Sequence, residues 1–377
     1  GYPHEPLLEG QVIEAGAARM EVLYTPGHTP NSVSLLVSDL VRSPDPAMIL
    51  TGDVLFVGDI GRPDLPGAAI LDEQVQNLHD SLSVKLAKLP PELEVYPAHG
   101  QGSLCGRGMS AKGVSTLGYE RRANAMLRFA DFASFKKAVL SRLPARPKSF
   151  SHIIETNRRG APLRDSCPQE HELSPERFAA LMEAPDTVVI DSRDAAAYGG
   201  THIPGSLNIG FEKQLANWVG MSVAPGAKIC IVAADRERAS AMRLELFRIG
   251  YDDILGHLAG GMSAWTLSGR PVASLPQMSV HDLAAALSGE TPPLLLDVRT
   301  DAEWEDGHAP QAVHRPFADI LERGPDVCLT GPVAVVCGSG YRSNIIGSAL
   351  AASGCADVRS VAGGMIAWTR AGLPTVT

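Results

Sequence analysis

The sequence contains no long run of basic residues and no apolar run of the roughly 18 residues that a membrane-spanning helix requires. Its formal net charge is −9 at pH 7. A surface with this excess of negative charge repels phosphate backbones and anionic lipids. We therefore expect neither nucleic acid nor membrane among the partners of this protein.

Paired cysteine spacings are also absent, although the chain has 377 residues and six cysteines. The cysteines are scattered along the sequence: Cys105, Cys167, Cys230, Cys328, Cys337 and Cys355. Small disulfide-stabilised domains show close, paired spacings instead. The pattern indicates a reducing compartment, so we expect a cytoplasmic protein, and the length predicts two or three domains.

One of these cysteines stands in a loop suited to binding an anion. Segment 337–343 reads Cys-Gly-Ser-Gly-Tyr-Arg-Ser, between an apolar strand-like run (333–336) and a helical pattern. Backbone N–H groups at such a turn can converge on the sulfur of Cys337, and Arg342 adds a fixed positive charge. We expect the loop to hold either the Cys337 thiolate or a sulfur anion delivered to it. An inert cysteine beside an ordinary turn is the alternative.

These residues resemble the active-site loop of the rhodanese family of sulfurtransferases, in which the cysteine accepts a sulfane sulfur as a persulfide and passes it to a thiophilic acceptor. The six residues from Cys337 to Arg342 match the rhodanese loop, whereas the related dual-specificity phosphatases use one residue more. The resemblance implies catalytic roles for Cys337 and Arg342. It also implies substrate-binding roles for Gly338, Ser339, Gly340, Tyr341 and Ser343.

The second half of the chain is a tandem repeat. Segment 188–193 matches 294–299 at an offset of 106, and segment 259–265 matches 362–368 at an offset of 103. Strand and helix patterns alternate in each copy, which predicts a parallel α/β sheet with crossover helices. Both copies resemble rhodanese domains.

The first repeat lacks the nucleophile. Ala233 occupies the position of the cysteine, although Arg238 still matches the loop arginine. Asp235 and Glu237 add negative charge that repels an anion. We therefore expect the first repeat to be catalytically silent and to serve in packing or docking.

Acidic residues also occur in the second repeat, upstream of the Cys337 loop. Asp297 and Arg299 match a strand-end pair that mainly braces the sheet in rhodaneses, so we expect them to be structural. Asp301 and Glu303 would lower the positive potential of the loop wherever they lie near it.

The first 115 residues carry three segments of His and Asp, each following a strand-like run. They are Thr-Pro-Gly-His-Thr-Pro-Asn-Ser (25–32), Thr-Gly-Asp (51–53) and Tyr-Pro-Ala-His-Gly (96–100). Imidazole and carboxylate groups at the ends of buried strands can point at one metal ion. The pattern therefore predicts a metal site.

In this order, the three segments resemble the C-terminal half of a metallo-β-lactamase fold, and more narrowly its glyoxalase II and persulfide dioxygenase branch. The resemblance implies His28 and Asp53 as metal ligands. His99 matches a position that binds a second metal only in the dinuclear hydrolases. The implied metal is Fe(II) for a persulfide dioxygenase, or zinc for a thioester hydrolase of the glyoxalase II type.

The His-x-His-x-Asp-His motif that this fold carries in its N-terminal half is absent from the sequence. Its first histidine would complete a 2-His-1-carboxylate set with His28 and Asp53. We therefore expect a metal site that is one ligand short and a sequence that begins inside the domain. Dioxygenase activity should be weak unless another chain supplies the missing half.

Two residues of the first region are further substrate candidates. Arg62 could clamp a substrate carboxylate by a bidentate contact, or pair structurally with Asp64. Cys105 stands in a glycine-rich loop that resembles dioxygenase domains fused to rhodaneses. It could act as a substrate-side thiol, while a packed cysteine is the alternative.

Together these features predict an α/β protein made of a partial metallo-β-lactamase αββα domain followed by two rhodanese-like parallel α/β domains. The expected parts are a metallo-β-lactamase-like region (1–145), a linker (146–171), a degenerate rhodanese domain (172–275) and an active one (276–377). The expected function is sulfur metabolism, with oxidation of a thiol persulfide to sulfite at mononuclear iron and sulfane-sulfur transfer through a Cys337 persulfide. Its partners would be small molecules, namely thiol persulfide, thiosulfate or sulfite, and a homo-oligomer is compatible with the sequence. A zinc thioester hydrolase fused to a rhodanese and a non-catalytic sulfur-binding module are the alternatives.

Overall fold

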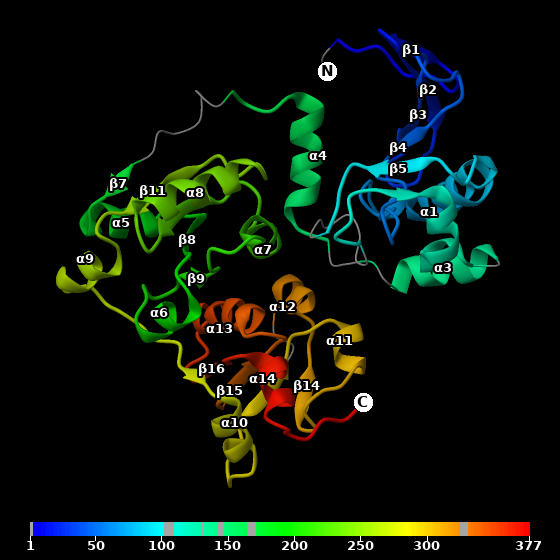
Figure 1. Ribbon diagram of the computed structural model, residues 1–377. Coiled ribbons are helices and arrows are strands. Elements are labelled where there is room, and N and C mark those ends of the chain that lie inside the picture. The colour runs from blue at the N-terminus through cyan, green and yellow to red at the C-terminus, as the bar shows by residue number, and fades with distance from the viewer. Residues whose placement is uncertain are drawn as a thin grey trace. The chain divides into compact units, whose positions relative to one another are not determined.

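The computed structural model describes residues 3–101, 109–129, 131–141, 143, 146–163, 171–324 and 331–377 (Figure 1). The chain forms two compact units, one within residues 2–145 and the other within 146–377. The predicted fold class is confirmed, because a mixed six-stranded sheet in the first unit precedes two parallel sheets in the second.

The first unit is built on a sheet with the strand order β1-β2-β3-β4-β5-β6. Neighbouring strands are antiparallel except for the parallel pair β4 and β5. The strands are β1 (Val12–Ala15), β2 (Ala18–Tyr24), β3 (Val33–Asp39), β4 (Met48–Gly52), β5 (Glu94–Pro97) and β6 (Ser115–Thr116). The predicted His and Asp segments follow β2, β4 and β5, so the sheet brings them to its end.

Helices cover the apolar face of this sheet. Ile49 of β4 and Val95 of β5 are buried with Val75 and Leu78 of α1 and with Phe135 of α3. The helical elements are η1 (Ala68–Ile70), α1 (Leu71–Asp80), η2 (Ser81–Lys85), η3 (Leu86–Lys88), α2 (Leu117–Ala123), η4 (Ala125–Leu127) and α3 (Phe132–Ser141).

The segment expected to be an irregular linker contains a helix, α4 (Ser149–Arg159). Its side chains contact the first repeat, since Ser149 is buried and His152 Nε2 lies 3.0 Å from the carbonyl oxygen of Gly250. The expectation was wrong for this stretch because these tertiary contacts stabilise a helix whose polar sequence favours it only weakly.

The two repeats of the second unit have the same sheet topology. Their strand orders are β7-β11-β10-β8-β9 and β12-β16-β15-β13-β14, with every pair parallel. The strands of the first repeat are β7 (Glu172–Leu173), β8 (Thr187–Asp191), β9 (Leu207–Asn208), β10 (Lys228–Val232) and β11 (Ile254–Leu258). Those of the second are β12 (Gln277–Met278), β13 (Leu294–Asp297), β14 (Ala312–His314), β15 (Val333–Val336) and β16 (Val358–Val361).

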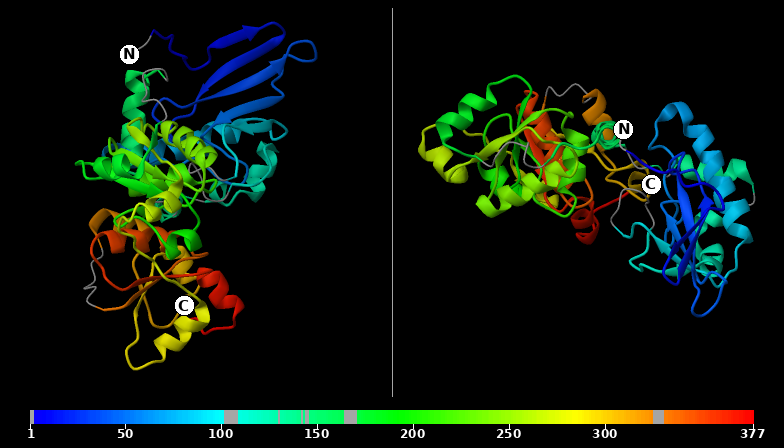
Figure 2. Two further views of the ribbon diagram at one scale, coloured as in Figure 1. Left: turned by 90° about the vertical axis from the view of Figure 1, so that its left-hand side faces the viewer. Right: turned by 90° about the horizontal axis from the view of Figure 1, so that it is seen from above.

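Helices alternate with these strands, as crossover connections require (Figure 2). The first repeat has α5 (Pro175–Met182), α6 (Ala195–Gly200), α7 (Leu215–Ser222), α8 (Arg236–Phe247) and α9 (Gly261–Leu267). The second has α10 (Val280–Leu287), α11 (Asp301–Glu305), α12 (Phe317–Arg323), α13 (Tyr341–Ala352) and α14 (Gly364–Arg370). Within the described ranges, none of the helices combines the length and the apolar character needed to cross a membrane.

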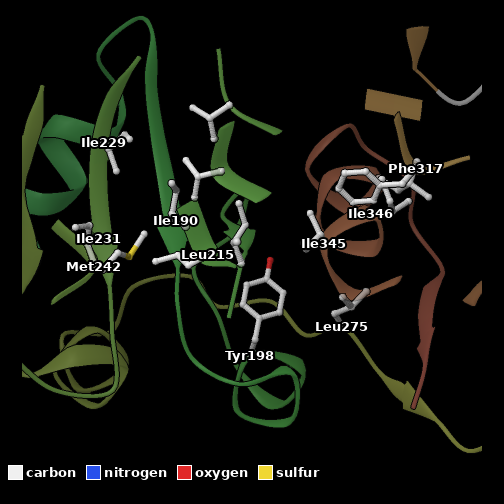
Figure 3. Close-up of a cluster of buried hydrophobic side chains, with 14 of the residues drawn as sticks. Ile190, Tyr198, Leu215, Ile229, Ile231, Met242, Leu275, Phe317, Ile345 and Ile346 are labelled. Carbon is white, nitrogen blue, oxygen red and sulfur yellow. The ribbon is translucent and has the colours of Figure 1, made fainter. Parts of the chain in front are cut away.

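The repeats share one apolar cluster, which we call the shared core. It joins Ile190 and Ile231 of the first sheet to Ile345 and Ile346 of α13, and Leu275 between the repeats belongs to it (Figure 3). All five side chains are at most 1% exposed. The helix that follows the Cys337 loop is therefore packed into both repeats.

Candidate active site

The Cys337 loop, which we define as residues 337–342, leaves the fully buried strand β15 and enters α13. Gly340 is the residue before the first turn of α13 and has φ +102°. A side chain is disfavoured at this positive φ, so glycine permits the sharp turn. The turn brings the N–H of Gly340, the residue just before the helix, back toward the cysteine.

The sulfur of Cys337 lies inside this turn. The Gly340 N–H donates to Cys337 Sγ at 3.2 Å, and Sγ lies 3.7 Å from Ser343 Oγ. Ser343 is itself held, because its hydroxyl donates to the Gly340 carbonyl at 3.0 Å and lies 3.0 Å from Ser360 Oγ. Cys337 is only 1% exposed. The Gly340 N–H therefore points its dipole at the sulfur, in the direction that stabilises negative charge there.

Helix α14 fixes the loop from behind. The Met365 N–H donates to the Cys337 carbonyl at 2.7 Å, and the Ile366 N–H donates to the Gly338 carbonyl at 3.0 Å. Gly364 makes this approach possible, because a Cβ there would lie 2.2 Å from the Cys337 carbonyl oxygen. In the sequence this glycine stands out only as part of the repeated motif. Its recurrence in both copies was the signal that could have assigned it a role.

Arg342 does not face the sulfur as a free positive charge. Its guanidinium donates to both carboxylate oxygens of Glu303, at 2.8 and 2.6 Å. Burial disfavours the charged form of Glu303, but the hydrogen bonds and charge of Arg342 outweigh it and lower the pKa of this carboxyl to about 2. The positive charge of Arg342 is thus largely compensated by Glu303. Asp301, the other acidic residue considered, instead has its Oδ1 atom 3.8 Å from His314 Nδ1.

Tyr341 connects the two repeats. Its hydroxyl donates to the Gly210 carbonyl of the first repeat at 2.8 Å, and burial raises its pKa. Two turns further along α13 lies a similar contact, because the Asn208 N–H donates to Ser348 Oγ at 3.0 Å. The hydroxyl of Tyr341 is therefore occupied by a structural hydrogen bond.

A cleft of about 650 Å³ lies between the Cys337 loop and the first repeat. The second repeat lines it with Gln277, Ser339, Gly340, Tyr341, Asn344, Ala362 and Gly363. The first repeat contributes Ser192, Arg193, Asp194, Ala195, Ala196, Asn208, Gly210, Phe211, Glu212, Ala234 and Arg238. The sequence did not predict a cleft shared by the repeats, because its walls come from segments up to 171 residues apart.

Asp297 and Arg299 form a buried pair at the end of β13. Arg299 Nη2 lies 2.7 Å from Asp297 Oδ2 and also donates to the Gly307 carbonyl at 2.9 Å. The first repeat has the same arrangement, since Arg193 Nη2 lies 2.6 Å from Asp191 Oδ2. Such pairs connect a strand end to the following loop in both repeats, in keeping with the structural role expected for Asp297 and Arg299.

In the first unit, the structure brings together the three predicted metal ligands. His28 Nε2 lies 3.8 Å from Asp53 Oδ2, and His99 Nδ1 lies 2.5 Å from Asp53 Oδ1. His28 Nδ1 lies 2.9 Å from the Arg62 carbonyl oxygen, which orients the ring as outer contacts orient metal ligands. Burial lowers the pKa of His28, which favours the neutral imidazole.

These residues do not form a complete metal site by themselves. His99 contacts Asp53 directly, and within the described ranges no group of three or more His, Cys, Asp or Glu is arranged to hold a metal ion. The donor types suit a 2-His-1-carboxylate set, but the arrangement does not. The metal roles of His28, Asp53 and His99 stay predictions.

The other two candidates of the first unit have different outcomes. Arg62 is 3% exposed and donates to both oxygens of Asp64 at 2.6 Å, so the structural pairing is present. A role in substrate binding stays a prediction. Cys105 lies outside the described residues.

Comparison with known proteins finds similarity in both parts of the chain. A model of the rhodanese-like domain matches residues 174–268 and 279–371. A probable metallo-hydrolase of Bacillus subtilis (strain 168) is 38% identical over 99 residues, covering 26% of this chain and 42% of its own length. The mitochondrial persulfide dioxygenase of Bos taurus is 28% identical over 151 residues, covering 40% of this chain and 52% of its own. The chain thus spans about half, or less, of these curated relatives.

A solved structure extends the similarity across both units. The crystal structure of a metallo-β-lactamase from Staphylococcus aureus subsp. aureus COL is 30% identical, with a TM-score of 0.58. The match covers 67% of this chain and 70% of that one. Because the first unit holds only residues 2–145, a match of this extent includes part of the repeats.

Proposed function

Because the chain belongs to the proteins that combine a metallo-β-lactamase-like region with rhodanese-like domains, we propose that it is a sulfurtransferase whose second repeat carries sulfane sulfur on Cys337. The observation that carries the proposal is the hydrogen bond from the Gly340 N–H to Cys337 Sγ within a six-residue loop. An inert core cysteine needs no such contact. We place the activity in the cytoplasm because the cysteine pattern indicates a reducing compartment.

In the first half of the proposed reaction, the Cys337 thiolate attacks the sulfane sulfur of thiosulfate or of a thiol persulfide. A bond forms between Sγ and that sulfur, the donor's S–S bond breaks, and its electron pair leaves with sulfite or with the thiolate. In the second half, an acceptor thiolate attacks the outer sulfur of the Cys337 persulfide. The electron pair of the broken bond then returns to Sγ, so no external oxidant or reductant is consumed.

The residues of the loop have distinct parts in this reaction. The Gly340 N–H stabilises charge on Sγ or on the transferred sulfur, as backbone donors do at other oxyanion and thiolate sites. Ser343 limits the movement of the sulfur through its own hydrogen bonds. The pair of Arg342 with Glu303 holds the first turn of α13 against α11, so that Arg342 acts mainly by positioning.

The substitution Cys337→Ser tests the proposal, and Cys355→Ser is the matched control in the same repeat. We expect thiosulfate:cyanide sulfur transfer to fall to background in the first variant and to stay within twofold of the original rate in the second. After reaction with thiosulfate, mass spectrometry should find one added sulfur atom on the peptide with Cys337. Transfer that survives Cys337→Ser would reject the proposal in favour of a non-catalytic sulfur-binding module or another nucleophile.

We further propose that the first unit takes part in oxidising a thiol persulfide to sulfite, which its similarity to a persulfide dioxygenase supports. His28 and Asp53 would hold iron(II), which supplies the activation of dioxygen in such reactions. The described residues do not complete the set of ligands. Hydrolysis at zinc is the second candidate, supported by the metallo-hydrolase relative.

Metal content measured together with O₂ uptake separates these two reactions. Iron near one per chain with uptake on a thiol persulfide supports oxidation, and zinc with thioester cleavage supports hydrolysis. Little metal and no turnover, with Cys337-dependent transfer retained, would reject both for this chain. The substitution Asp53→Asn should lower bound metal if the predicted ligands are correct.

A further inference from the structure

A lost carboxylate distinguishes the first repeat from the second. At the offset of 106 that relates the strand ends, Ala197 takes the position of Glu303. Glu303 is the residue that binds both guanidinium nitrogens of Arg342. Arg238, the counterpart of Arg342, is therefore retained in a repeat that has lost the partner of this arginine.

The side chain of Arg238 lies over the ring of Phe211 and, among the residues that the structure describes, has no carboxylate partner like that of Arg342. Its guanidinium carbon lies 4.9 Å from the centre of the Phe211 ring, a cation–π contact that leaves the N–H donors available. The backbone N–H of Arg238 donates a hydrogen bond to Asp235 Oδ1 at 2.8 Å. Over the described ranges, the structure gives its guanidinium neither a hydrogen bond nor an ion pair.

Arg238 also lines the cleft that the Cys337 loop lines from the other side. The other arginine of this cleft, Arg193, is paired with the buried carboxylate of Asp191 at 2.6 Å. Two carboxylates, Asp194 and Glu212, face the same space, and Asp194 accepts the Ala197 N–H at 2.8 Å. Arg238 is thus the cleft-lining cation that no carboxylate engages in the described part of the chain.

We infer that Arg238 binds the anionic sulfur donor of the Cys337 reaction, with thiosulfate as the representative substrate; this rests on the proposed sulfur transfer. A planar guanidinium can present two N–H donors to a sulfur oxyanion, as it does to phosphate. The cleft volume lies within the range of small-molecule sites. Arg342 is paired with Glu303 and does not line the cleft, whereas Arg238 does.

This assignment gives the first repeat a substrate-binding role in place of the silent packing or docking role predicted from its loop. Arg238 recruits and orients the donor, whereas Cys337 carries out the covalent step. Glu212 opposes the anion in the same cleft and weakens its binding.

The first test is the steady-state kinetics of Arg238→Gln with thiosulfate. We expect the KM for thiosulfate to rise about tenfold, the size of one lost charge-assisted contact, with kcat changed less than threefold. Arg238→Lys should recover part of the affinity. Arg236→Gln is the matched control, because Arg236 lies on the same helix, is 71% exposed and does not line the cleft. Equal KM values for the two Gln variants would overturn the inference.

A gain of the missing carboxylate tests the same idea without removing the arginine. Ala197 is exposed, so Ala197→Glu should be tolerated and should engage Arg238 as Glu303 engages Arg342. We expect the KM for thiosulfate to rise by a similar factor. In the double variant Ala197→Glu/Arg238→Gln, the two effects should not add. Fully additive effects would contradict a common origin in Arg238.

Binding to Cys337→Ser separates failure of this inference from failure of the proposed function. Calorimetric titration with thiosulfate needs no turnover, and we expect Arg238→Gln in this background to weaken binding about tenfold. Arg238-dependent binding, combined with no sulfur transfer by the original chain that keeps Cys337, would reject the proposed function and keep the anion site. Binding that ignores Arg238, or no measurable binding, would overturn the inference.

Discussion

The two repeats have the same strand order but begin the helix after their central strand differently. Helix α8 begins at Arg236, two residues before its arginine, and Asp235 caps it by accepting the Arg238 N–H. Helix α13 begins at Tyr341, one residue before its arginine, after Gly340 at positive φ. In the first repeat the Arg238 N–H donates to the Asp235 carboxylate, and in the second the Gly340 N–H donates to the Cys337 sulfur.

This difference shows that more than the cysteine separates the repeats. The first loop lacks the glycine that turns the chain back and contains a carboxylate that accepts the helix-start N–H. It also lacks the Glu303 partner, so its arginine faces the shared cleft. One ancestral arrangement thus supports a nucleophile in one copy and, by our inference, an anion-binding group in the other.

Among these predictions, we expect the largest loss of stability and of sulfur transfer from an alanine substitution at Gly364, the glycine of α14 that packs against the Cys337 loop. Gly364 and Gly261 are matched residues with φ +54° and +58°, but a Cβ would lie 2.2 Å from a carbonyl oxygen at Gly364 and 3.5 Å at Gly261. We expect Gly261→Ala to cost about 1–2 kcal/mol from the left-handed backbone. Gly364→Ala should cost at least about 3 kcal/mol, because overpacking adds to this strain, and should lower sulfur transfer more than 100-fold.

Urea unfolding and thiosulfate turnover of the two alanine variants measure this contrast. Gly261→Ala should keep most of the turnover, because it does not touch the Cys337 loop. Equal losses in the two variants would mean that α14 does not hold the loop in place.

A smaller effect is expected at the Arg342 pair, where Glu303→Gln removes the charge that the first repeat already lacks. The folded-state pKa of Glu303 is about 2, below its ordinary value of 4.5, so its stabilisation is present above pH 4.5 and is lost as the pH falls through 2. The side chain is 38% exposed, so we expect a loss of only about 1 kcal/mol at pH 7.

Unfolding free energies between pH 2 and 7 check this prediction. The difference between the original protein and Glu303→Gln should be constant above pH 5 and shrink toward pH 2. A difference that does not change with pH would show that the carboxylate charge is not the stabilising feature.

Tyr341→Phe should lower the free energy of unfolding by as much as Glu303→Gln or by less, because it removes only one contact between the repeats. It removes the hydroxyl that donates to the Gly210 carbonyl, which costs about 1 kcal/mol. We expect a lower urea midpoint with an unchanged slope and a KM for thiosulfate within twofold of the original. A large loss of turnover would instead indicate that the Tyr341 hydroxyl contacts the substrate.

The smallest expected effect is from restoring only the nucleophile to the first repeat. Ala233→Cys in the Cys337→Ser background should transfer no sulfur above background, because Asp235 already accepts the helix-start N–H. Adding Asp235→Ser and Arg236→Gly would remove the capping carboxylate and supply the glycine that corresponds to Gly340, and any gain should need all three changes. Turnover from Ala233→Cys alone would show that the cysteine was the only important loss.

Much of this architecture could be predicted from sequence because it is local or repeated. The apolar run before Cys337 and the glycines after it predict the strand, turn and helix, and the matching segments reveal the duplication. The pairing of Arg342 with Glu303 joins residues 39 apart, and Tyr341 contacts a carbonyl 131 residues away. Such contacts depend on how each repeat packs and how the repeats pack against each other, and the hydrophobic periodicity of the sequence does not predict that packing.

The repeat offset of 106 nevertheless relates Ala197 to Glu303 in the sequence. Once the pairing of Arg342 with Glu303 is known, the alignment of Ala197 with Glu303 identifies Arg238 as an arginine without its partner. For the candidate metal ligands, sequence predicts less. The strand-end positions of His28, Asp53 and His99 predict that these side chains lie close together, but not the distances between them, and those distances determine whether an ion fits.

The shared core has a consequence for how such a duplicated gene can change. Ile345 and Ile346 lie one turn into the helix that starts at the Cys337 loop, and they are buried among side chains of both repeats. A deletion of the copy without the cysteine would expose them and loosen the helix that the other copy needs. The buried side chains of the first repeat are therefore part of what holds the catalytic helix of the second, independently of the side chains that the first repeat presents to the cleft.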